Sequence, residues 1–134
     1  FEAHEFATSI GAIDFAKMIN GKVVANEDLM PVKKLYGYTV IDSLTVIMEL
    51  PYTRSPRLSG SISERAFIFT KVSTGRSPLV VVRVTAMKPR VIVLHGLDAD
   101  KIDELALKIA EKEQIPVITT KMDILKIKDS LNKI

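Results

Sequence analysis

The residues best suited to chemistry in this chain lie in short turns that follow apolar runs of sequence. The first of these turns consists of Thr74, Gly75, Arg76 and Ser77. It lies at the N-terminus of a predicted helix, where free backbone N–H groups and the helix dipole favour an anion. The arginine adds a planar fork that suits phosphate or carboxylate. The turn therefore predicts an anion site, with a capped turn and a solvated arginine as the structural alternative. It is not a P-loop, because the Gly-Lys-Ser/Thr ending is missing.

Two more groups of polar residues follow the next predicted strands. His95 and Gly96 come directly after an apolar run, and a histidine there can bind a ligand near neutral pH or hydrogen-bond a turn. The other group, which either completes the same pocket or caps the last helix, consists of Thr119, Thr120 and Asp123. Ligands of α/β proteins gather at the carboxyl ends of parallel strands. We therefore expect one shared cleft that binds a small anionic metabolite or a nucleotide.

The sequence predicts neither a metal centre nor a catalytic site. An acidic cluster is a candidate for a cation, but its spacing fits no EF-hand loop and helix capping explains it. The cluster consists of Asp98, Asp100, Asp103 and Glu104. There is no nucleophile–base pair or paired-carboxylate site, and the lack of cysteine removes disulfides, zinc knuckles and thiol catalysis. We expect a protein that is not an enzyme and that carries no cofactor.

Composition narrows the class of protein further. A chain of 134 residues with 47% hydrophobic and 26% charged residues suits a folded domain with a sizeable core. The net charge of +3 and the lack of tryptophan argue against direct nucleic-acid binding. No apolar run approaches the roughly 20 residues that span a bilayer. We expect a cytoplasmic protein that contacts no membrane.

The fold class follows from the stretch between Arg90 and Asp123. Val91 to Leu94 is a continuous apolar run, a helix-period segment follows, and a second apolar run, Val117 to Thr119, comes after Pro116. Two buried strands joined by a helix make a parallel crossover with both faces of the sheet covered. This predicts an α/β fold with three layers, α/β/α, and a mostly parallel central sheet.

The remaining elements are expected as follows. Residues 1–10 form a lead-in or linker and residues 11–134 a single domain. Asp98 or Asp100 caps the helix of the crossover, and the last helix begins near Asp123. Residues 44–50 fit a strand or a helix equally well. The other predicted elements are a helix over 11–20 capped by Ser9, strands near 23–24, 38–41 and 66–72, and a long loop over 52–63.

Residues 79–84 carry conflicting signals. Their sequence, LVVVRV, has strand propensity, whereas Ser77 and Pro78 before them form a good helix start. Two apolar strands separated only by residues 73–77 would make a hairpin. Since packing overrides small differences in helix propensity, we predict a helix that begins after the Ser77 cap.

Basic side chains outside these turns are expected to be solvated. Arg54, Arg57 and Arg65 flank the long loop and are candidates to hold an anionic partner, with solvated loop charge as the favoured interpretation. The C-terminal lysines are interrupted by acidic residues, which indicates a polar helix face. These lysines are Lys121, Lys126, Lys128 and Lys133.

Over residues 11–131 the order of elements resembles the DRTGG domain family. The resemblance rests on three segments: GAIDFAKMINGKVVANEDL, AFIFTKVSTGRSPLVVVRVTAMKPRVIVLHG and ALKIAEKEQIPVITTKMD. Arg76, Gly96 and Asp123 match positions of the family pattern, whereas Gly75 stands in place of its aspartate. The resemblance implies a fold similar to the N-terminal domain of HPr kinase/phosphorylase. It also implies a regulatory or dimerising module, found alone or attached to helix-turn-helix or CBS domains.

Two functions remain open from the sequence. The first is a non-catalytic regulatory domain that self-associates, with a dimer favoured, and binds a small anionic metabolite or nucleotide. The second is a purely structural oligomerisation domain of a larger protein, such as a transcriptional regulator or a metabolic enzyme. The apolar content of residues 79–84 favours the second.

Overall fold

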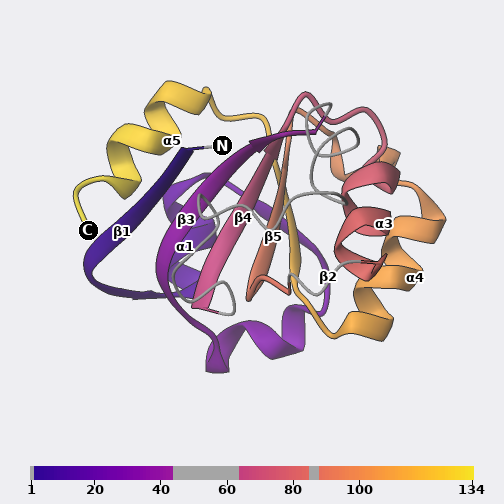
Figure 1. The fold of residues 1–134 in the computed structure, drawn as a ribbon, viewed down its shortest axis with the longest axis horizontal. Helices are drawn as coiled ribbons and strands as arrows, with labels where there is room; N and C mark the ends of the chain where they lie inside the picture. Colours follow the sequence, from indigo (N-terminus) through magenta and orange to yellow (C-terminus); the bar gives the residue numbers. More distant parts are fainter. Residues whose placement is uncertain (1, 44–63, 85–87) are drawn as a thin grey trace.

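A computed structural model describes residues 2–43, 64–84 and 88–134 (Figure 1). The segment 44–50 and the loop predicted over 52–63, with Arg54 and Arg57, lie outside the described residues.

The described residues build one six-stranded mixed sheet. Its inner strands run parallel to one another, and a strand pairs antiparallel at each edge. In spatial order the strands are β1 (Glu2–Gly11), β3 (Lys34–Asp42), β4 (Arg65–Thr70), β5 (Val91–His95), β6 (Val117–Thr120) and β2 (Lys22–Ala25). The predicted mostly parallel sheet is therefore confirmed, including the crossover from β5 to its neighbour β6.

Helices cover both faces of this sheet and make three layers (Figure 1). One pair, α3 (Arg76–Val84) and α4 (Glu104–Glu113), packs on one face. The other pair, α1 (Ala12–Met18) and α5 (Ile124–Leu131), packs on the opposite face. Two short 3-10 helices, η1 (Glu27–Val32) and η4 (Ala99–Lys101), lie in the connections.

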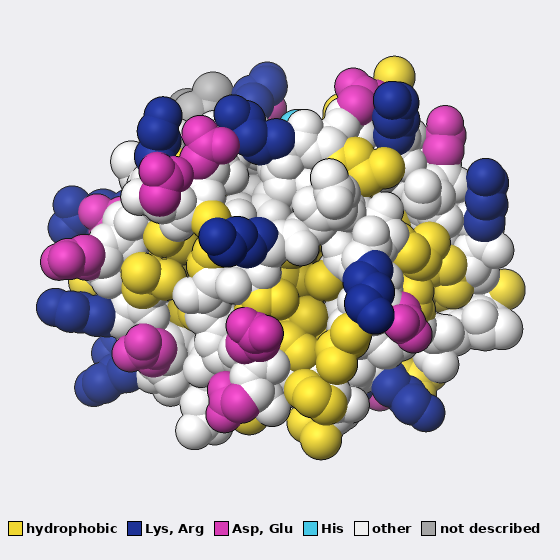
Figure 2. All heavy atoms as spheres, turned by 180° about the vertical axis from the view of Figure 1, so that it is seen from behind, with side chains coloured by type: hydrophobic (Ala, Val, Ile, Leu, Met, Phe, Trp, Pro, Cys, Tyr) yellow, Lys and Arg dark blue, Asp and Glu magenta, His cyan; other side chains and the backbone are white. Residues whose placement is uncertain are grey.

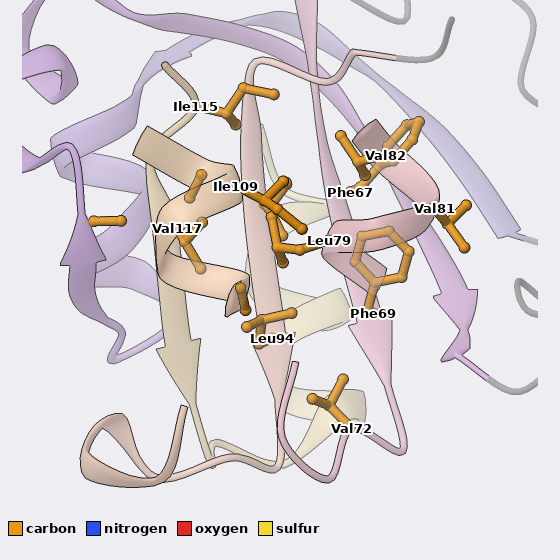
Figure 3. Close-up of a cluster of buried hydrophobic side chains, with 14 of the residues drawn as sticks. Phe67, Phe69, Val72, Leu79, Val81, Val82, Leu94, Ile109, Ile115 and Val117 are labelled. Carbon is orange, nitrogen blue, oxygen red and sulfur yellow. The ribbon is translucent and has the colours of Figure 1, made fainter. Parts of the chain in front are cut away.

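Each face of the sheet has its own hydrophobic core, because the inner strands are apolar on both sides. In β4, Phe67 and Phe69 face α3 and α4, while Ala66 and Ile68 face α1 and α5. Figure 3 shows the first core, where Phe67 and Phe69 meet edge to face with ring centroids 6.1 Å apart. Strands buried on both faces have continuous apolar sequences. This explains why β4, β5 and β6 can be predicted from the sequence.

The N-terminal segment differs from the prediction of a lead-in. Residues 2–11 form β1, an edge strand that pairs with β3 from Glu2 opposite Val40 to Gly11 opposite Lys34. Its register shifts between Glu5 and Ile10, and Phe6 is its one buried residue. A bulged edge strand that buries a single side chain shows no two-residue alternation, so its sequence carries no strand signal.

Several helices begin at positions other than the predicted caps. Ser9 lies in β1, and α1 starts at Ala12 without a side-chain cap. Asp103, rather than Asp98 or Asp100, caps α4 by accepting from the N–H groups of Leu105 and Ala106. The helix over 79–84 is confirmed as part of α3, although it starts at Arg76 instead of after Ser77. The predicted start of α5 is confirmed, because Asp123 accepts from Lys126 N–H at 3.3 Å.

Tyr38 makes the unfolding of this protein sensitive to alkaline pH. Its hydroxyl donates to Asn132 Oδ1 at 2.7 Å, and burial, aided by the Glu2 carboxylate, raises its pKa. The folded protein thus holds this proton more tightly than the unfolded chain. The contribution to stability is intact below about pH 10 and is lost as the pH rises further. We expect Tyr38→Phe to flatten the decline in melting temperature above about pH 10. An equally steep decline in the variant would contradict this assignment.

Candidate functional site

The Gly-Arg turn leads from β4 into α3 and is shaped by packing. Gly75 has φ of +82°, and a Cβ there would lie 2.7 Å from Leu94 Cδ1. Only glycine combines that dihedral with such a close approach. Arg76 is 61% exposed, and its Nε lies 3.9 Å from Asp103 Oδ2. Arg76 and Ser77 line a hollow of about 240 Å³ with two valines of α3.

His95 ends β5 beside β6, and Gly96 follows it in the turn. His95 pairs with Thr120 in the sheet, and Gly96 N–H donates to the Thr120 carbonyl at 2.8 Å. His95 Nε2 lies 2.7 Å from the Met122 carbonyl oxygen. Because a carbonyl only accepts, Nε2 carries a proton, which leaves Nδ1 as the nitrogen available to a ligand.

Two of the three polar residues at the end of β6 are engaged inside the protein. Thr119 and Thr120 are both 3% exposed. The Thr120 hydroxyl donates to the Ile19 carbonyl at 2.7 Å and accepts from Met122 N–H at 3.1 Å. Asp123 caps α5. These residues therefore hold β6 and α5 in place beside His95.

The structure places four of the predicted site residues in two different hollows. The one that contains His95 and Gly96, which we call the edge hollow, has a volume of about 580 Å³. It lies on the α5 side of the carboxyl ends of the parallel strands. It is lined by Val40, Thr70, Lys71, Val72, His95, Gly96, Ile124 and Lys128. Arg76 and Ser77 line a separate hollow on α3. The structure therefore has two hollows where the sequence predicts one shared cleft.

The edge hollow is lined by two lysines, and each is paired with a carboxylate. The sequence does not single out Lys71, and it predicts that Lys128 belongs to a polar helix face. Lys71 follows β4, and its Nζ lies 2.8 Å from Asp42 Oδ2. Lys128 lies one helical turn after Ile124, and its Nζ lies 3.0 Å from Glu2 Oε2. Lys71 also has a left-handed backbone, with φ of +57°, and its carbonyl accepts from the Ser43 hydroxyl at 2.9 Å. Few lysines adopt that conformation, and residues held in it are common at functional sites.

Other hollows lie on the helical faces. A groove of about 690 Å³ runs between α3 and α4. Its apolar lining consists of Val80, Leu105 and Ile109, and its charged lining of Arg83, Lys108, Glu111 and Lys112. Another, of about 300 Å³, lies between α1 and η1 and includes Met30 and Pro31. Figure 2 shows the molecule from behind. On this side, hydrophobic side chains gather in the lower half, between charged ones.

Arg65 is not the solvated loop charge that the sequence predicts. It is 1% exposed at the start of β4, where its guanidinium donates to the Tyr38 carbonyl at 3.1 Å and to the Thr39 hydroxyl at 2.8 Å. It also pairs with the Glu5 carboxylate of β1. Burial lowers its pKa. Arg65 therefore ties β1, β3 and β4 together rather than holding a partner.

The acidic cluster after β5 is engaged in local contacts. Besides the Asp103 cap, Asp98 pairs with Lys101 at 3.7 Å and with Lys121 at 3.3 Å. Within the residues that the structure describes, no group of three or more histidine, aspartate or glutamate side chains is placed to hold a metal ion. The same residues contain no helix long and apolar enough to cross a bilayer.

The fold belongs to the α/β class, and a solved structure with a similar fold supports this assignment. The structure is similar to the crystal structure of the CBS and DRTGG domains of the regulatory region of Clostridium perfringens pyrophosphatase, solved with the activator diadenosine tetraphosphate. The TM-score is 0.57 at 15% identity, over 92% of this chain and 47% of the other. The chain thus has a DRTGG-like α/β fold. No protein-family model matches its sequence.

Sequence comparison finds more similar relatives. The chain is 45% identical over 130 residues to an uncharacterised transcriptional regulator of the helix-turn-helix (HTH) type from Methanocaldococcus jannaschii. It is 47% identical over 120 residues to another from Archaeoglobus fulgidus. These matches cover 97% and 90% of this chain, but 53% and 51% of the relatives. The chain therefore spans about half the length of the curated relatives that it matches.

Proposed function

We propose that this chain is the ligand-sensing half of an HTH transcriptional regulator and a divergent DRTGG domain. The observation that carries the proposal is the similarity, at 45% and 47% identity, to about half of two such regulators. The DRTGG-like fold supports a regulatory role, because the similar solved structure belongs to a regulatory region. In this arrangement the other half of the protein binds DNA, and this half responds to a small anionic metabolite or nucleotide.

The chemistry of the described surface supports the ligand half of this proposal. The edge hollow lies at the carboxyl ends of parallel strands, where α/β proteins bind ligands. Its volume of about 580 Å³ is within the range of small-molecule pockets. Two lysines line it and favour an anion. The Arg76 turn is the alternative anion site.

The regulatory role is tested by the affinity of the full-length polypeptide for DNA. A DNA sequence is first selected in vitro from a random pool, and binding is then measured by fluorescence anisotropy with each of a panel of nucleotides and phosphorylated metabolites. Allosteric coupling between two sites is typically about 5- to 150-fold in affinity. We expect at least one compound to change DNA affinity by about fivefold or more. DNA affinity that no bound compound alters would overturn the regulatory proposal.

A second candidate function is self-association through α3. Val80 and Val84 are 36% and 69% exposed on this helix, and Leu105 of α4 is 37% exposed beside the groove between them. Exposed apolar patches on soluble domains mark interaction sites. We propose that two copies of the chain meet at this surface.

Light scattering with size-exclusion chromatography tests the self-association surface. We expect the wild-type chain to elute as a dimer and the double variant Val80→Lys/Val84→Lys as a monomer, because two charges would be buried in the interface. Leu125→Lys is the control, since Leu125 is 64% exposed on α5, outside the groove. A monomeric wild type, or a double variant that remains dimeric, would contradict the surface.

A further inference from the structure

We infer that the edge hollow binds a small phosphate monoester, with its phosphate between Lys71 and Lys128 and its organic part against Val40, Val72 and Ile124. The inference deepens the ligand half of the proposed function and rests on it. It assigns the ligand to residues around His95 and away from the Arg76 turn.

The two lysines approach the hollow from different elements. Lys71 comes from the end of β4, and Lys128 comes from the middle of α5. Both reach carboxylate oxygens, at 2.8 Å for Asp42 and 3.0 Å for Glu2. Their ammonium groups are therefore held where anionic oxygens can meet them. A ligand phosphate can take the place of these carboxylates, or join them, at the same donors.

The donor set suits a phosphate. Lysine ammonium groups are compact point charges with three donors each, and lysine is a common ligand of phosphate. The described lining of the edge hollow contains lysines and no arginine. Thr70 adds a hydroxyl donor. His95 adds Nδ1 as a donor when the ring is an imidazolium, because its Nε2 already donates to the Met122 carbonyl. A monoester offers one dianionic group and one organic substituent, as the mixed lining requires.

The backbone conformation at the end of β4 fixes the position of Lys71. Lys71 keeps φ of +57° although it is neither glycine nor asparagine. The Ser43 hydroxyl, bonded to its carbonyl at 2.9 Å, and the ion pair with Asp42 hold it there. Strain of this kind persists only where the surroundings enforce it, and it is common at ligand sites. Its effect here is to hold Lys71 at the rim of the hollow.

The ion pair between Lys128 and Glu2 connects the site to the edge of the sheet. Glu2 begins β1, which lies beside α5 (Figure 1). A phosphate that takes Lys128 releases this carboxylate and loosens the start of β1. Removing the Glu2 charge should therefore strengthen ligand binding, whereas removing either lysine charge should weaken it. These opposite effects distinguish a specific site from general attraction of anions.

Isothermal titration calorimetry on the purified chain tests the inference. The probes are the four nucleoside 5′-monophosphates, glucose 6-phosphate, phenyl phosphate and inorganic phosphate. We expect at least one monoester to bind, and Lys128→Gln and Lys71→Asn each to weaken that binding about tenfold or more. Asparagine is chosen at 71 because it tolerates a positive φ. We expect Glu2→Gln to strengthen binding severalfold and Lys121→Gln, a control paired with Asp98 outside the hollow, to leave it unchanged.

The outcomes separate this inference from the function on which it rests. If no probe binds the wild type, the ligand class is wrong. If a monoester binds equally well to both lysine variants but weakens in Arg76→Gln, the site is wrong while ligand sensing stands. If the lysine variants weaken binding but Glu2→Gln weakens it too, the displacement of Glu2 is wrong. A far-ultraviolet circular dichroism spectrum of each variant confirms that it is folded.

Discussion

Replacing Arg65 with alanine is expected to lower the free energy of unfolding by about 2–4 kcal/mol, because two buried acceptors lose their donor and each unsatisfied group costs about 1–3 kcal/mol. The substitution removes donors from the Tyr38 carbonyl and the Thr39 hydroxyl, and it leaves Glu5 without its partner. It also leaves a void where a side chain only 1% exposed stood. Because Arg65 joins three strands, the loss should appear in global unfolding as well as in β1.

Urea denaturation followed by circular dichroism measures this change. Arg83→Ala is the matched control, because Arg83 is an exposed arginine at the end of α3, and surface substitutions usually change stability by less than about 0.5 kcal/mol. A loss below about 1 kcal/mol for Arg65→Ala, near the average for any point substitution, would show that Arg65 does not hold the strands together.

The second large effect is expected at Gly75. Gly75→Ala should lower the free energy of unfolding by about 2–4 kcal/mol, because a residue with a side chain is strained at positive φ and the new methyl group overpacks the core. The methyl carbon would lie 2.7 Å from Leu94 Cδ1. Gly96→Ala is the matched control, since Gly96 has φ of +91° but nothing within 4 Å of its Cβ position.

Thermal and urea unfolding of the two glycine variants separate the causes. In the control, Gly96→Ala, the free energy of unfolding should fall only by the cost of backbone strain, about 1–3 kcal/mol. In Gly75→Ala it should fall by more. Equal losses in both variants would show that packing against Leu94 contributes nothing. A substantial difference would show that the Gly-Arg turn has a structural role, whichever hollow binds the ligand.

The sequence predicts those parts of the fold where local pattern and packing agree. β5, α4 and β6 follow from continuous apolar runs and a helix-period segment, and all three are present. Residues 79–84 show that start signals can outweigh β-branched propensity, because α3 buries Leu79, Val81 and Val82 on one face. β1 could not be predicted, since an exposed, bulged edge strand has no period.

The site was less predictable than the fold. His95 and Gly96 stand out because a polar pair ends an apolar strand, and they do line a hollow. Lys71 and Lys128 are separated by 57 positions and resemble any surface lysine in the sequence. They line the same hollow only in the folded chain. The role of Arg65 could not be predicted, because nothing in the sequence distinguishes a buried arginine at the start of a strand from a solvated one in a loop.

The most direct test of the account is a two-dimensional ¹H–¹⁵N NMR titration of the chain with the monoester that binds best in calorimetry. We expect the largest chemical-shift changes at residues 70–72, 95–96 and 124–128, with smaller changes at the start of β1. Changes confined to residues 74–81 would place the ligand at the Arg76 turn and contradict the edge hollow as the sensing site.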